Sequence, residues 1–211
     1  MVEEENMGSM VEIIEDIDEK LDDKDTVREL ALKSSRVIRR LSHQMIQEIH
    51  RGSFDREKMN EALKEVSKIQ SIVEDYPELY HSGFLRNGFQ ELAEAHILWK
   101  ISDGEAPNPP EELGITPSSY LLGLADVVGE LRRSSLDALT DGDLGKAREY
   151  LKKMEIIKDY LMGFDYPKAI VPLKHKQDVA RDLVEKTRGD LATFIRSDQL
   201  QEKMDDLLEK L

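Results

Sequence analysis

Residues 115–143 read ITPSSYLLGLADVVGELRRSSLDALTDGD, and this stretch indicates a helical fold. Thr116 can cap the first turn of a helix, and Pro117 then occupies the first helical position, where proline is favoured. Apolar residues recur three and four positions apart until Asp141-Gly142, where a glycine can end the helix. We therefore predict one amphipathic helix here. Its predicted core stripe is Leu121, Leu124, Ala125, Val128 and Leu131.

The same helical spacing continues on both sides of this stretch, and no segment shows the alternation of a strand. We predict helices at about 10–22, 25–50, 55–76, 77–102, 116–141, 143–162 and 172–195, with a short eighth from Ser197. Segment 103–117, rich in glycine and proline, is predicted to be a connecting loop. The predicted fold is an all-α, single-domain superhelical bundle of about seven helices. We assign residues 1–24 to an acidic segment with a short helix, and residues 25–211 to the helical domain.

The composition excludes several classes of protein. The chain has 211 residues, enough for one domain with a substantial core, and it contains no cysteine. A disulfide framework, a thiol nucleophile and a cysteine-ligated zinc site are therefore excluded. The N-terminus lacks the pattern of a signal peptide, and no apolar run is long enough to span a membrane, so we expect a cytoplasmic protein without membrane contact.

Charge is distributed unevenly along the chain. The net charge of −14 argues, on average, against nucleic-acid binding. Residues 1–25 contain eleven acids and two lysines, a net charge of −9, whereas residues 28–51 contain six basic residues and two acids, a net charge of +4. A basic face can therefore exist on this acidic molecule.

Two predicted helices each carry a pair of carboxylates. Glu91 and Glu94 are three residues apart, and Asp126 and Glu130 are four apart, so each pair lies on one helix face. Glu94 lies in a markedly apolar stretch. If the two helices pack against each other, four carboxylates come together, which is unfavourable unless a cation neutralises them. Mg²⁺ or Mn²⁺ would suit such oxygen ligands, although the same spacing is also typical of solvated helix faces.

Basic side chains accompany these acids. Arg36, Arg40 and His43 follow helical spacing on the helix predicted at 25–50, and Arg86 lies about one turn before Glu91. They predict a surface that contacts phosphates, with an ordinary solvated face as the alternative. The chain has no P-loop and no dinucleotide-binding motif, so the sequence does not support these nucleotide sites. A di-iron site is weakly supported, because such bundles need two Glu-x-x-His motifs and this chain has one.

Four segments together resemble the translin family. They are SSRVIRRLSHQMIQEIHRG (34–52), YHSGFLRNGFQELAEA (80–95), ITPSSYLLGLADVVGELRRSSLDALTDGD (115–143) and KQDVARDLVEKTRGDL (176–191). The resemblance begins near residue 28 and does not include the acidic N-terminus. Within the family, the Gln-Glu-x-x-Glu and Asp-x-x-x-Glu patterns of the type called translin-associated protein X fall on Gln90 to Glu94 and on Asp126 to Glu130. Ser82 and Phe84 replace basic or imidazole residues seen in translin.

The resemblance implies a homo-oligomeric shell, expected to be an octamer, that binds RNA or single-stranded DNA inside. It also implies a Mg²⁺-dependent endoribonuclease of prokaryotic, single-gene type. We expect Glu91, Glu94 and Asp126 to bind the metal and Glu130 to be a fourth ligand or a base. Arg36, Arg40, His43 and Arg86 would contact phosphates. Two alternatives stay open: a non-catalytic nucleic-acid-binding shell like translin itself, and an all-α, Mg²⁺-dependent nucleotide pyrophosphohydrolase.

Overall fold

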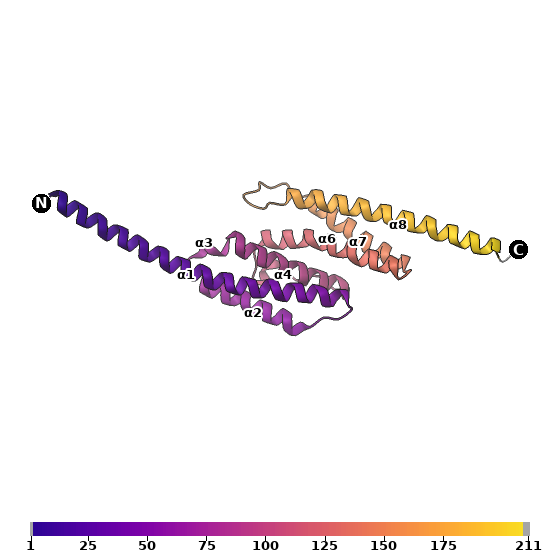
Figure 1. The fold of residues 1–211 in the computed structure, drawn as a ribbon, viewed down its shortest axis with the longest axis horizontal. Coiled ribbons are helices and arrows are strands. Elements are labelled where there is room, and N and C mark those ends of the chain that lie inside the picture. Colours follow the sequence, from indigo (N-terminus) through magenta and orange to yellow (C-terminus); the bar gives the residue numbers. More distant parts are fainter. Residues whose placement is uncertain (1, 209–211) are drawn as a thin grey trace.

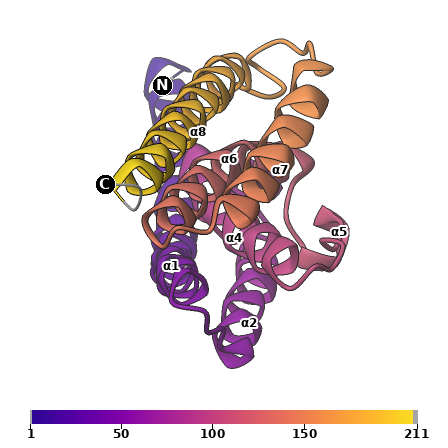
Figure 2. The ribbon, with the colours of Figure 1, turned by 90° about the vertical axis from the view of Figure 1, so that its right-hand side faces the viewer.

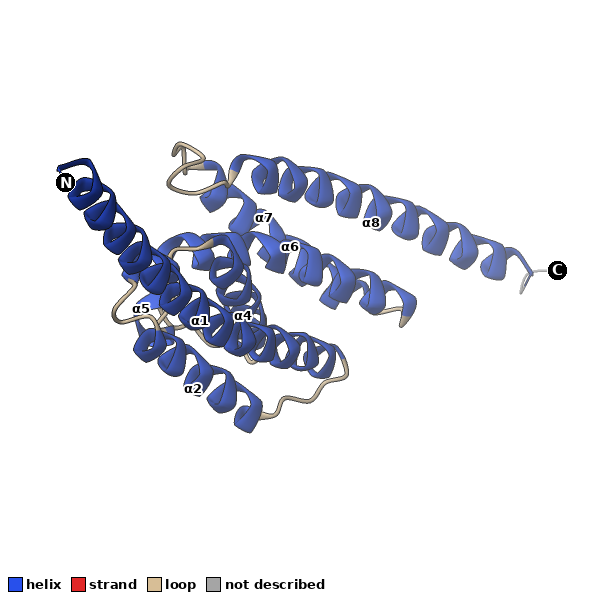
Figure 3. Cartoon of the chain, turned by 60° about the vertical axis from the view of Figure 1, so that its left-hand side comes forward, coloured by secondary structure: helices blue, strands red, loops and turns tan. Residues whose placement is uncertain are grey.

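A computed structural model of the protein describes residues 2–208, and over this range the chain consists of helices and loops (Figures 1 and 3). The all-α prediction is confirmed. Six long helices and two single-turn helices follow one another in the described range: α1 (Val2–His50), α2 (Arg56–Ile72), α3 (Pro77–Tyr80), α4 (Gly83–Ser102), α5 (Pro110–Leu113), α6 (Pro117–Thr140), α7 (Leu144–Met162) and α8 (Lys174–Leu208).

The largest difference from the predicted helices is at the N-terminus. The separate helices predicted at 10–22 and 25–50 are one continuous helix, α1, which crosses the predicted boundary between residues 24 and 25 without a break. The reason is local, because residues 9–51 contain neither glycine nor proline. Asp22, Asp23 and Asp25 lie within this helix and are exposed, so their carboxylates stay in water.

Smaller differences follow the same local rules. The helix predicted at 77–102 is divided at Ser82, whose extended backbone precedes the first residue of α4. Within the predicted loop, Pro110 begins the single turn α5, and Gly114, with a φ of 65°, ends it. The prediction of a separate short helix from Ser197 is wrong, because α8 continues through this region to Leu208.

The helices pack around a central pair, α4 and α6 (Figure 2). Helices α1 and α4 lie side by side, α2 packs against α1, and α7 and α8 pack against α6. Phe89, Leu92 and Ile97 of α4 are fully buried. On α6, Ala125, Val128 and Leu131 are buried, but Leu121 and Leu124 are only half-buried. Because neighbours cover α6 on several sides, its apolar surface is broader than a single stripe.

Two glycines allow these helices to approach closely. A Cβ atom on Gly123 of α6 would lie 2.5 Å from the backbone oxygen of Gln90 and 2.8 Å from the backbone nitrogen of Glu94. A Cβ atom on Gly88 of α4 would lie 2.5 Å from Oγ of Ser35 on α1. All three distances are shorter than real Cβ contacts. At Gly123 the close atoms belong to the backbone, so the spacing of α4 and α6 depends on glycine there, whereas at Gly88 the closest atom is a serine hydroxyl oxygen.

No helix in the described range is long and apolar enough to cross a membrane.

Candidate functional site

A cleft of about 330 Å³ lies where α1, α4 and α6 meet. All four acids singled out in the sequence line it. The lining residues are His43, Ile46, Gln47, Gln90, Glu91, Glu94, Asp126, Glu130 and Arg133. The structure therefore brings the two acid pairs to one place, with basic residues from α1 and α6 beside them.

Helix spacing and the glycine contact together place the acids. Glu91 and Glu94 are about one turn apart on α4, and Asp126 and Glu130 are about one turn apart on α6. Gly123 precedes Asp126 by about one turn and lets the backbone of α6 lie directly against the segment from Gln90 to Glu94. A larger residue there would push the two acid pairs apart.

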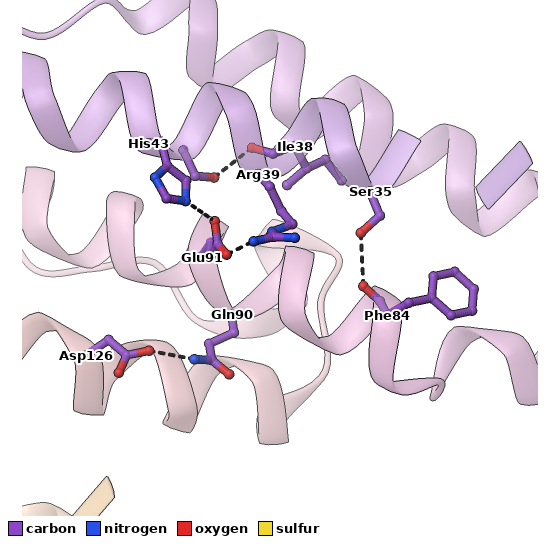
Figure 4. Close-up of polar contacts among 9 residues, drawn as sticks. Ser35, Ile38, Arg39, His43, Phe84, Gln90, Glu91 and Asp126 are labelled. Atoms are coloured by element: carbon purple, nitrogen blue, oxygen red, sulfur yellow. Dashed lines mark hydrogen bonds and ion pairs between the residues drawn. The ribbon is translucent and has the colours of Figure 1, made fainter. Parts of the chain in front are cut away.

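Glu91 is held by two basic residues of α1 (Figure 4). Nε of Arg39 donates a hydrogen bond of 2.9 Å to Oε1 of Glu91. Nε2 of His43 lies 2.7 Å from the other oxygen, Oε2, and forms an ion pair when protonated. The two atoms do not have the geometry of a hydrogen bond, so this buried Oε2 has no hydrogen-bond partner within the described part of the chain. Glu91 thus has one oxygen satisfied and one still able to accept.

Asp126 is held from two sides. Nε2 of Gln90, the residue directly before Glu91 on α4, donates a hydrogen bond of 2.5 Å to Oδ2 of Asp126 (Figure 4). Nζ of Lys176, near the start of α8, donates to Oδ1 and forms an ion pair. Asp126 therefore has an amide on one oxygen and an ammonium group on the other.

Glu130 is paired with the last residue of α1. Nε2 of His50 lies 2.5 Å from Oε2 of Glu130, and the side chain of His50 is only 5% exposed. The hydrogen bond from His50 lowers the pKa of Glu130 below its ordinary value, and the positive charges of His50, Arg133 and His43 add to this effect. Partial burial opposes the shift but is outweighed. Glu130 is therefore a carboxylate at neutral pH.

Glu94 is the exception among the four acids. Burial raises its pKa to about 8, and the negative charges of Asp126, Glu130 and Glu91 act in the same direction. Lys176 opposes this rise without cancelling it. Glu94 is therefore mostly protonated at pH 7.

The residues of the cleft suit a divalent cation in chemistry, although not in their present arrangement. Carboxylate oxygens are ligands that Mg²⁺ and Mn²⁺ prefer. Oε2 of Glu91 accepts no hydrogen bond, and Glu94 is protonated, and both features fit a cluster that would be stabilised by added positive charge. Among the described residues, however, no three acidic or histidine side chains are grouped closely enough to hold one ion. The basic partners of Glu91 and Asp126 would have to give way.

The predicted phosphate-contacting residues are placed differently from one another. His43 lines the cleft. Arg36 and Arg40 are exposed on α1, and Arg86 is half-buried on α4; none of the three lines the cleft. The structure thus brings one of the four predicted basic residues to the acids and leaves the other three outside it.

The sequence did not predict that four other polar residues, Arg39, His50, Arg133 and Lys176, lie beside the acids. Lys176 and His50 contact acids that are 50 and 80 positions away in the chain, so no local spacing points to them. Arg133 had a weak signal, because it follows Glu130 by three positions on the same helix and so lies on its face. Arg39 could likewise have been placed on the same helix face as His43, because it lies one turn before it.

Several known proteins are similar to this chain. An uncharacterised protein of Methanocaldococcus jannaschii, MJ0175, is 39% identical over 188 residues, which cover 87% of this chain and 83% of that protein. Among solved structures, a complex of AfC3PO with duplex RNA superposes with a TM-score of 0.77 at 31% identity, covering 87% of this chain and 97% of that one. The crystal structure of AfC3PO gives a TM-score of 0.68 at 33% identity with the same coverage.

A third structure, apo-NeC3PO, is 20% identical with a TM-score of 0.67 over 88% of this chain and 96% of that one, and it supports the fold alone. The sequence model of the translin family matches residues 24–188, which include α4, α6 and every residue that lines the cleft. The chain belongs to the translin family.

Proposed function

We propose that this protein binds RNA and cleaves it as a Mg²⁺-dependent endoribonuclease, working as a closed homo-oligomer. The observation that carries the proposal is the convergence of Glu91, Glu94, Asp126 and Glu130 on one cleft between α4 and α6. Family membership supports nucleic-acid binding, as does the likeness to AfC3PO, whose solved complex contains duplex RNA. Single-stranded DNA is proposed as a further ligand, and eight copies as the size of the shell.

In this proposal Glu91, Glu94 and Asp126 would hold the metal ion, with Glu130 as a fourth ligand or as a base beside it. A bound Mg²⁺ supplies charge stabilisation for a phosphodiester under attack and lowers the pKa of a water molecule that it binds. Glu94 must lose its proton to bind the metal, so metal binding should release protons below about pH 8.

The protein's own residues position and neutralise the reacting groups. His50 keeps Glu130 ionised, so that Glu130 can orient a water molecule or accept a proton from it. Gln90 fixes one oxygen of Asp126. Arg133 and His43 line the same cleft and can donate to the phosphate oxygens of an RNA strand. Lys176 and Arg39 pair with Asp126 and Glu91, and they would be free to donate to the same phosphate oxygens if these two acids held a metal ion instead.

The direct test is cleavage of labelled RNA by the purified protein. Single-stranded and duplex RNA are incubated with the wild type and with Asp126→Asn, in Mg²⁺ and in EDTA. We expect Mg²⁺-dependent cleavage by the wild type and a loss of at least about 100-fold in the variant, as is typical when an electrostatic stabiliser is removed. Asp137→Asn, an exposed acid farther along α6, is the matched control and should cleave normally. Equal rates for wild type and Asp126→Asn would exclude the catalytic assignment.

A second candidate function is binding without cleavage. It is favoured by the pairing of Glu91 and Asp126 with basic side chains, and by the lack of a ready three-ligand group in the described residues. In that case the wild type would retain RNA in a filter-binding assay but leave it intact in both Mg²⁺ and Mn²⁺. Light scattering on the same samples tests the shell, which should have the mass of eight chains.

A further inference from the structure

The first part of α1 extends beyond the body of the molecule as a single helix (Figure 1). We call residues 7–23 the arm. At its base, Nζ of Lys24 forms an ion pair of 2.6 Å with Glu78 of α3, and from there on α1 packs against α2 and α4. The match to the translin family begins at residue 24, so the arm lies outside the segment that the family shares.

The arm carries one row of exposed apolar side chains. Its members are Met7, Met10, Ile14, Ile17 and Leu21, and their side chains are 50–61% exposed. They follow one another at alternating steps of three and four, which is the heptad spacing of a coiled-coil seam. Val11 and Ile13, equally exposed, flank the row. Such a contiguous apolar row on a helix marks a contact surface.

The same row continues into the body of the protein, where it is covered. After Lys24 and Arg28 the steps of three and four continue through five buried residues, Ala31, Ser35, Ile38, Ser42 and Met45. Oγ of Ser35 donates a hydrogen bond of 3.0 Å to the backbone oxygen of Phe84, so α4 covers this part of the row. The row is thus a helix-packing surface along its whole length, and only its first half is exposed.

Charge placement favours a second copy of the arm as the occupant. Although residues 1–25 carry a net charge of −9, the acids of the arm lie mostly on the face away from the row. Those outer positions hold Glu12, Glu15, Asp16, Glu19, Asp22 and Asp23. Of the arm's charged residues, only Asp18 and Lys20 flank the row. Two arms can therefore meet without bringing their acidic faces together.

The body of the protein decides the direction of pairing. A second arm running parallel along the row would continue into the space that α4 occupies beside Ser35. An antiparallel arm leads away from the body instead, and Met10 then lies beside Leu21 of the second copy, and Ile14 beside its Ile17. In this register Asp18 is next to Val11 of the other arm, and Lys20 next to its Ile13, so no like charges oppose each other.

We propose that the arms of two copies of this chain pair as an antiparallel two-helix coiled coil, and that this contact joins molecules through a surface outside the shared family fold. The inference does not depend on RNA binding or cleavage, and its test uses neither.

Because the chain has no cysteine, paired cysteines can report the contact directly. The double variant Met10→Cys/Leu21→Cys is oxidised mildly with diamide, and covalent dimers are measured on a non-reducing gel. We expect efficient dimer formation by the double variant and little by either single variant. In antiparallel arms, two copies of residue 10 are separated by about 16 Å along the helix, which is beyond the reach of a disulfide.

The matched control is Glu12→Cys/Glu19→Cys, whose two cysteines are level with each other across the arms in the same register but lie on the outer face, so it should give little dimer. Adding Ile14→Gln and Ile17→Gln to Met10→Cys/Leu21→Cys should lower the dimer yield at least several-fold, with helical content checked by circular dichroism. The proposal is overturned if Met10→Cys/Leu21→Cys gives no more dimer than the control. It is also overturned if the single variants dimerise as well as the double variant, which would mean parallel pairing, or if the glutamines leave the yield unchanged.

Discussion

Glu94 is the residue whose surroundings most affect its chemistry. Its carboxyl group lies between α4 and α6, and burial, together with the negative charges of Asp126 and Glu130, raises its pKa to about 8. A protonated acid is the least costly state there, because an ionised one would be both desolvated and repelled.

At the residue scale, we therefore predict a pH-dependent loss of stability that Glu94→Gln removes. The pKa of Glu94 in the folded protein lies above the ordinary value of 4.5, so the protonated group stabilises the fold fully below about pH 4.5, and this contribution is lost as the pH rises through about 8. Between pH 5 and 9 the free energy of unfolding of the wild type should therefore fall by roughly a few kcal/mol relative to that of the variant.

Urea denaturation at several pH values, without divalent metals, measures this difference. Glu149→Gln changes an exposed acid on α7 and should follow the wild type at every pH. Parallel stability curves for the wild type and Glu94→Gln would contradict the prediction.

A second prediction at this scale concerns Lys176, whose ammonium group pairs with Asp126. If Asp126 binds a metal, the lysine competes for the same carboxylate. Lys176→Met should therefore bind Mn²⁺ several-fold more tightly than the wild type, as measured by isothermal titration calorimetry. Lys174→Met, an exposed lysine on the same helix, should leave the affinity unchanged. Weaker binding by Lys176→Met would show that the lysine supports the metal site rather than competing for it.

At the scale of the elements, the contact between α4 and α6 holds the cleft together. Gly123 is where the two backbones come closest, since an added Cβ would overlap the backbone of Gln90 and Glu94. Backbone atoms cannot move aside as a flexible side chain can, so any larger residue must separate the two helices.

We predict that Gly123→Ala destabilises the protein by about 1–3 kcal/mol, as overpacking does, and separates the acids of the two helices. Gly129→Ala on the same helix is the control, because its Cβ would make only an ordinary contact of 3.9 Å with Leu183. That variant should be as stable as the wild type or slightly more stable, because alanine favours helix. Denaturation of the two variants side by side is the measurement. Equal stabilities would show that α4 and α6 tolerate a wider spacing.

At the scale of the whole molecule, the net charge of −14 repels nucleic acid, so binding must come from a local basic surface. We predict that RNA affinity falls steeply with salt concentration, and that Arg36→Ala/Arg40→Ala reduces the slope of log K against log [salt] by about 1.5. Fluorescence anisotropy with labelled RNA measures the slope. Lys64→Ala, an exposed residue on α2, should leave it unchanged. A slope near zero for the wild type would rule out phosphate contacts as the source of affinity.

The local features of this protein could be predicted from its sequence. Helix class, the capped start of α6 at Thr116 and the placement of each acid pair on one helix face depend on residues within a few positions of each other. The division at Ser82 and the continuity of α1 also depend on local residues, but the sequence is ambiguous there. Aspartate is favoured at the start of a helix and can also occur within an exposed helix, as it does at residues 22–25.

The sequence by itself determined that the chain is helical, and that Glu91, Glu94, Asp126 and Glu130 are paired on two helices. Only the tertiary structure decided that the two pairs share one cleft, that His50 and Lys176 pair with acids far away in the chain, and that Arg36, Arg40 and Arg86 lie outside it. The physical reason is that helix formation depends on neighbours in sequence, whereas burial and the pKa of a carboxyl such as Glu94 depend on which helices pack together and how closely. Here a single glycine, Gly123, sets that distance.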